Sequence, residues 1–210
     1  EALGSDTLGS KSVAIGTSAL YTQNFTSATD AYNTAVGHNS GTNVTTGVNN
    51  TLIGGLAGDA LNTGSTNVAL GVEALTTEDT GQGAVAIGYQ ALYAQNYDGV
   101  SYNVAVGRNA GEAVTSGIQN TIIGGLAGTQ GTDLTTGSNN ILLGYLTGTS
   151  AADSLNQFVI GVNVSGGENE QITIGTSAGV VQNEFDTDAT WTRTSDVRLK
   201  TDIADATLGL

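Results

Sequence analysis

The feature that most constrains this chain is a short motif, three mostly apolar residues followed by glycine, that recurs ten times. It is clearest at residues 85–88, which read Val-Ala-Ile-Gly. The glycines that close the motifs are separated by 21, 17, 17, 17, 19, 17, 20, 17 and 14 residues. They are Gly16, Gly37, Gly54, Gly71, Gly88, Gly107, Gly124, Gly144, Gly161 and Gly175. A near-constant period with length changes confined to one part of the unit predicts a solenoid, in which each repeat is one turn of a coil.

The triplet before each glycine predicts a β-strand. Its third residue is Ile, Val or Leu in all ten units, and its first is Val, Thr, Ile or Phe, which are residues that favour strands. Glycine after the triplet suits a corner where the backbone turns sharply. We therefore expect an all-β fold, a parallel β-roll or β-solenoid of about ten short turns. Turns stacked about 4.8 Å apart give a rod roughly 50 Å long.

Both faces of these strands are apolar, which is typical of parallel strands that are buried on both sides. The first and third residues of a triplet share one face and the middle residue points the opposite way. We expect the larger first and third residues to fill the coil and the small middle residue to pack against other copies of the chain. The residues expected at that contact are Ala14, Ala35, Ala69, Ala86 and Ala105.

A longer repeat is superimposed on the short one. Residues 53–58 recur letter for letter at residues 123–128, and the repeat region, 1–179, divides into two four-turn cassettes, about 12–83 and 84–150, and two divergent turns. Residues 180–194 are expected to form a non-repeat neck that covers the open end. Asparagine precedes six triplets, where it tolerates a left-handed backbone and can bond to the next turn: Asn33, Asn50, Asn67, Asn103, Asn120 and Asn140.

Composition excludes several functions. The formal charge is −14 with only 5 Lys and Arg, so no nucleic-acid-binding face is expected. No apolar run is long enough for membrane insertion. The chain has no Cys and a single histidine, His38, and it lacks a calcium-loop motif, so we expect no metal and no cofactor. Because residue 1 is Glu, we expect a fragment of a longer protein.

These glycine-marked units resemble the head repeats of trimeric autotransporter adhesins and, more closely, repeats of phage tail fibres. The resemblance covers about residues 12–179. It implies a left-handed parallel β-roll and a homotrimer in which three rolls pack about a three-fold axis. Most units here have 17 or more residues, whereas the adhesin unit is shorter, so longer outer loops are expected.

The C-terminal residues carry a second resemblance. Residues 195–203, Ser-Asp-Val-Arg-Leu-Lys-Thr-Asp-Ile, are similar to the opening of the endosialidase-type intramolecular chaperone, a self-cleaving domain at the end of phage fibres. Ser195 and Lys200 match the family's nucleophile and lysine, which implies a cut before Ser195 in the full-length protein. Residues 195–210 would then be the start of a truncated chaperone domain. The alternative is a solvated linker.

Aromatic residues gather in the longest loops and are the candidate binding residues. They are Tyr21, Phe25 and Tyr32 in the first cassette, and Tyr93, Tyr97 and Tyr102 in the second. Such rings stack on sugars or anchor a protein receptor. The alternative is that they pack down onto the roll.

We therefore expect a structural and host-recognition segment of a homotrimeric viral or phage-like tail fibre, exposed at the virion tail or extracellular surface, and not an enzyme. Its expected partners are two identical chains, a host cell-surface glycan or protein receptor, and other tail or fibre proteins. The alternatives are a bacterial trimeric surface adhesin and a polysaccharide-degrading tail spike. The spike reading needs a pair of carboxylates in a cleft, which this sequence does not suggest.

Overall fold

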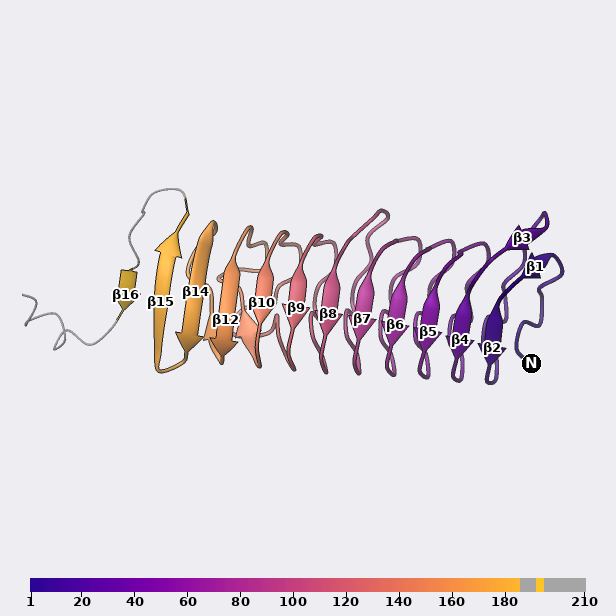
Figure 1. The fold of residues 1–210 in the computed structure, drawn as a ribbon, viewed down its shortest axis with the longest axis horizontal. Helices are drawn as coiled ribbons and strands as arrows, with labels where there is room; N and C mark the ends of the chain where they lie inside the picture. The colour runs from indigo at the N-terminus through magenta and orange to yellow at the C-terminus, as the bar shows by residue number, and fades with distance from the viewer. Residues whose placement is uncertain (186–191, 195–210) are drawn as a thin grey trace, which may run out of the picture.

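The chain forms a straight β-solenoid. The structure is a computed structural model that describes residues 1–185 and 192–194, and no helix occurs among them. A sheet of twelve strands runs the length of the rod, and each parallel strand belongs to one turn of the coil (Figure 1). The expected all-β solenoid of about ten turns is therefore confirmed.

The ten parallel strands coincide with the ten predicted triplets. They pair in sequence order, and each triplet lies in register with the next, as in Ala69↔Ala86 and Ala86↔Ala105. The strands are β2 (Val13–Ile15), β4 (Thr34–Val36), β5 (Thr51–Ile53), β6 (Val68–Leu70), β7 (Val85–Ile87), β8 (Val104–Val106), β9 (Thr121–Ile123), β10 (Ile141–Leu143), β12 (Phe158–Val162) and β14 (Gln171–Thr176).

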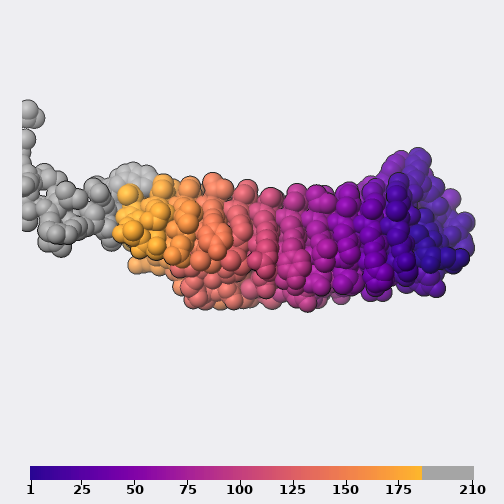
Figure 2. Space-filling model, turned by 90° about the horizontal axis from the view of Figure 1, so that it is seen from below, coloured from indigo at the N-terminus to yellow at the C-terminus, as the bar shows by residue number. Residues whose placement is uncertain are grey.

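The sheet ends where the chain reverses direction. After β14, β15 (Gly179–Glu184) pairs antiparallel with it, and β16 (Thr192–Thr194) pairs antiparallel with β15. Two short parallel pairs lie outside the main sheet: β1 (Gly9–Ser10) with β3 (Thr29–Asp30), and β11 (Thr147–Gly148) with β13 (Val164–Ser165). The chain projects from the rod around β3 and again between β7 and β8, while the turns between them stack closely (Figures 1 and 2).

The glycine after each triplet is required by contact between turns. Gly54 has a φ of 138°, and a Cβ atom there would lie 2.5 Å from the carbonyl carbon of Gly71 in the next turn. Other corners use side-chain-bearing residues in the left-handed region, such as Asn49 (φ 61°) and Leu56 (φ 60°). Several left-handed corners per turn keep the coil narrow, so the interior holds only a thin layer of side chains.

The middle residue of each triplet points into that interior. It is fully buried in nine consecutive triplets, from Ala35 in β4 to Thr173 in β14. The wall opposite the sheet carries Leu or Gly four residues after nine of the ten corner glycines, the exception being Ser165. Leu20, Leu75 and Leu92 stand there where the middle residue is Ala, whereas Leu52, Ile122 and Leu142 face turns with Gly at that position. In the turns of Ala35 and Ala105 both positions are small, and large side chains of the adjacent turns reach in beside Gly41 and Gly111. The two walls thus complement one another in size, which suits close packing.

A column of buried asparagines stitches one edge of the interior. The Asn50 and Asn67 backbone N–H groups donate to the side-chain Oδ1 of Asn33 and Asn50, at 2.9 and 3.0 Å. Each Nδ2 also donates to a carbonyl later in the same turn, as from Asn50 to Gly64 at 2.9 Å. The predicted bond to the neighbouring turn is confirmed, and no buried side-chain N or O atom in the described residues lacks a partner.

Candidate functional site

One face of the rod is an uncharged strip. We call it the outer sheet face: the first and third residues of the ten triplets, from Val13 and Ile15 in β2 to Ile172 and Ile174 in β14. None of these twenty side chains is charged, three are Thr, and none is buried. Ile15 is 59% exposed and Leu143 43% exposed. A continuous apolar surface of this length marks an interaction site.

This arrangement reverses the expected faces. Ala35, Ala69, Ala86 and Ala105 are fully buried inside their own coil, and Ala14 is partly buried in the first turn. They cannot form a contact with another chain. The physical reason is the thin interior: a turn has room for at most one large side chain between the sheet and the opposite wall, so the two bulky residues of a triplet cannot both point inward. The bulkier Val, Ile and Leu therefore face outward.

The loop aromatics do not form one platform. Phe25 is buried at 7% exposure, in agreement with packing onto the roll, and Tyr97 is partly buried. Tyr21, Tyr32, Tyr93 and Tyr102 are exposed. The Tyr32 ring is covered by the Lys11 ammonium at 5.1 Å, and no two of the six rings form an aromatic pair. These residues stay separate candidates for contact with a partner.

The aromatic pair that does occur among the described residues lies near the C-terminal end of the rod. Phe158 opens β12, and Phe185 follows β15; their ring centroids are 5.3 Å apart with an interplanar angle of 60°. Phe185 is 49% exposed. The chain reversal after β14 brings Phe185 back beside Phe158. The Phe185 backbone N–H then donates to the Glu170 carbonyl at 2.8 Å, which holds the residue in place.

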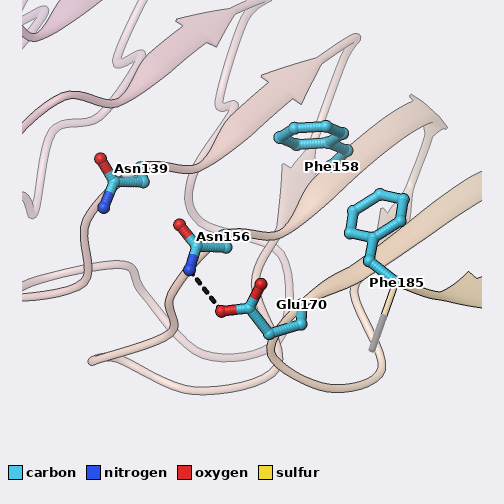
Figure 3. Close-up of a pocket in the computed structure, with 5 residues that line it drawn as sticks. All are labelled: Asn139, Asn156, Phe158, Glu170 and Phe185. Carbon is cyan, nitrogen blue, oxygen red and sulfur yellow. Dashed lines mark hydrogen bonds between the residues drawn. The ribbon is translucent and has the colours of Figure 1, made fainter. Parts of the chain in front are cut away.

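The two rings line an open pocket of about 460 Å³ together with three polar side chains, Asn139, Asn156 and Glu170 (Figure 3). These three residues stand at the same position in successive turns, two residues before the triplet, and all have a left-handed backbone. Asn156 Nδ2 donates to Glu170 Oε1. We call this set the terminal pocket. Sequence reasoning missed it, although Phe158 is the one aromatic residue among the ten first triplet positions.

A second polar cluster is buried and closed. The Glu78 carboxylate accepts from the Gly81 N–H at 2.8 Å and from Gln95 Nε2 at 3.0 Å, and Gln95 Oε1 accepts from Asn103 Nδ2 at 2.8 Å. Burial raises the pKa of Glu78, and these donors partly oppose the shift. The same arrangement occurs one cassette length earlier in the chain, with Asp6, Gln23 and Asn33. Its burial makes this cluster structural.

Other predicted features can be placed briefly. Ser195 and Lys200 lie outside the described residues. On the surface, Lys11 and Asp30 form an ion pair at 2.7 Å, which raises the pKa of the lysine and lowers that of the aspartate through their hydrogen bond. In the described part of the chain, no group of three or more His, Cys, Asp or Glu side chains could hold a metal ion. Nor is there, in that part, a helix long and apolar enough to cross a membrane.

Comparison of the chain with protein-family models, with curated proteins and with solved structures finds no match. We therefore infer a function for this chain from the outer sheet face, the terminal pocket and the repeat pattern.

Proposed function

We propose that this chain is a structural, non-enzymatic segment of a homotrimeric fibre, of the phage tail-fibre type, that presents surfaces for attachment to a host cell. The observation that carries the proposal is the outer sheet face. Parallel sheets are normally covered on both faces, and here the coil itself covers only one. Identical chains provide identical faces of the same length, so side-by-side copies cover one another along the whole rod.

The size of the face suits a stable assembly. Twenty side chains that are on average about one-third exposed present on the order of 1,000 Å² of apolar surface per chain, comparable to one side of a specific interface. The charge distribution favours the same packing. The chain carries a formal charge of −14, and the acidic residues of the described part lie off this face, so contact elsewhere would bring like charges together. Three-fold rather than two-fold symmetry rests on the resemblance of the repeats to trimeric fibres.

The proposal predicts a particle of three times the 21.0 kDa chain mass, measured by light scattering coupled to size exclusion. Val106→Glu tests which face makes the contact, because Val106 lies on the outer sheet face between Ile87 and Ile123 of the adjacent strands. Burying a carboxylate there costs several kcal/mol per chain, and symmetry brings three of them together. We expect folded monomers with an unchanged β-sheet circular dichroism spectrum.

Ser116→Glu is the matched control, since it adds the same charge at an exposed position off the outer sheet face. It should leave the trimer intact. A monomeric wild-type chain, or a Val106→Glu chain that still assembles as well as the control, would refute the proposal.

A further inference from the structure

We infer that the terminal pocket binds a neutral saccharide, as a mono- or disaccharide unit of a surface glycan. This inference rests on the proposed attachment role and assigns a site and a ligand class to it. The pocket combines an aromatic pair with a row of amide and carboxylate groups (Figure 3). A sugar ring has the complementary chemistry, with an apolar C–H face and a rim of hydroxyl groups.

The aromatic side of the pocket supplies the apolar contact. Phe158 and Phe185 are tilted at 60° rather than stacked face to face, and Phe185 is about half exposed. An exposed ring surface beside a cavity is a large and rigid contact area that loses little entropy on binding. A volume of about 460 Å³ is within the range of small-molecule sites.

The polar side supplies hydrogen bonds that remain available. Asn156 Nδ2 holds Glu170 Oε1, which fixes the two side chains relative to one another. Among the described residues, the Asn139 amide and the second Glu170 oxygen have no hydrogen-bond partner. Together they offer donors and acceptors in a row that follows the stacked turns. A wholly apolar ligand would leave these groups desolvated without partners, which is unfavourable.

Charge selects neutral sugars over acidic ones. Glu170 is the charged group that lines the pocket, and neither Lys11 nor Arg108, the only cations in residues 1–185, is part of it. A sialic or uronic acid would place its carboxylate beside Glu170, and no cation of residues 1–185 lines the pocket to compensate for the repulsion. The terminal pocket thus favours uncharged hexose or N-acetylhexosamine units.

The test is titration of the full 210-residue chain with cellobiose, lactose and N,N′-diacetylchitobiose, with binding monitored by saturation-transfer NMR. The acidic counterpart is 3′-sialyllactose, which contains lactose. We expect millimolar binding of at least one neutral probe and weaker binding of 3′-sialyllactose than of lactose. Phe185→Ala should lower affinity at least about tenfold. Tyr145→Ala removes another aromatic ring, 53% exposed, outside the pocket and should change nothing.

Amide chemical shifts of the wild-type chain keep the test independent of how the variants fold. Perturbations should centre on Asn139, Asn156, Phe158 and Glu170. Failure of all neutral probes to bind, perturbations centred elsewhere, or preference for the sialylated probe would overturn the inference. Light scattering on the same samples separates the two proposals. A trimer that binds no sugar refutes the pocket alone, and a monomer that binds sugar through these residues refutes the assembly alone.

Discussion

A corner glycine provides the sharpest test of how the turns stack. Gly54→Ala places a methyl group 2.5 Å from the carbonyl carbon of Gly71, at a φ of 138° that L-residues rarely adopt. The backbone strain costs about 1–3 kcal/mol. Relieving the overlap must separate the turns and weaken the 2.8 Å bond from the Gly71 N–H to the Ile53 carbonyl, worth about 1 kcal/mol more. We expect a total loss of about 2–4 kcal/mol.

The neighbouring residue is a matched control. A Cβ atom on Gly55 would have its nearest described neighbour, the His38 carbonyl oxygen, 4.0 Å away, and the backbone of Gly55 is not left-handed. Gly55→Ala should therefore change stability by less than about 0.5 kcal/mol. The same pair of letters recurs at Gly124 and Gly125, which offers an independent repetition in the second cassette.

Thermal unfolding, followed by far-ultraviolet circular dichroism at equal chain concentration, measures the difference, since assembly alone shifts apparent stability. Gly54→Ala should melt roughly 10 °C below Gly55→Ala, given about 2–4 °C per kcal/mol for a chain of this size. Equal melting temperatures for the two variants would refute the stacking argument.

Two further predictions concern the buried polar groups. Asn120→Ala should lower the free energy of unfolding by about 2–4 kcal/mol, because it leaves the Gly137 carbonyl and the Asn140 N–H buried without partners. Denaturant titration of this variant beside the surface control Ser116→Ala measures the loss. Equal unfolding midpoints for the two variants would contradict the prediction. Because the pKa of Glu78 is raised in the folded chain, the folded state binds its proton more tightly than the unfolded state. Stability should therefore fall as the pH rises from 4.5, the ordinary value, through the raised folded pKa, and Glu78→Gln should flatten that decline; an unchanged pH profile of melting temperature in Glu78→Gln would count against it.

The fold was predictable because the repeat specifies it locally. Each corner glycine, each strand triplet and each Asn–turn bond recurs with a period that only a coil satisfies. The direction of the triplet was predicted wrongly because alternation identifies two faces without saying which is inside. The sequence does hold the missing signal: the middle residue and the residue four after the corner glycine are never both large, as in the pairs of Ala with Leu75 and of Leu52 with Gly. Volume complementarity of this kind identifies side chains that meet.

The terminal pocket was not predictable from the period because it forms where the period stops. Phe158 belongs to the repeats and Phe185 to the segment after them. Only the antiparallel return of β15 brings the two rings together, and a strand's direction after the last repeat is not encoded in the repeats before it.

The register of the sheet has a consequence for how such rods can vary. Spacings between corner glycines range from 14 to 21 residues, yet every triplet aligns with the next without a slip. Extra residues enlarge a loop at the side and leave the distance between strands unchanged. The length of the rod therefore changes only in steps of one turn, when complete repeat units are added or lost. The side loops can change in length and sequence at any turn without altering that length.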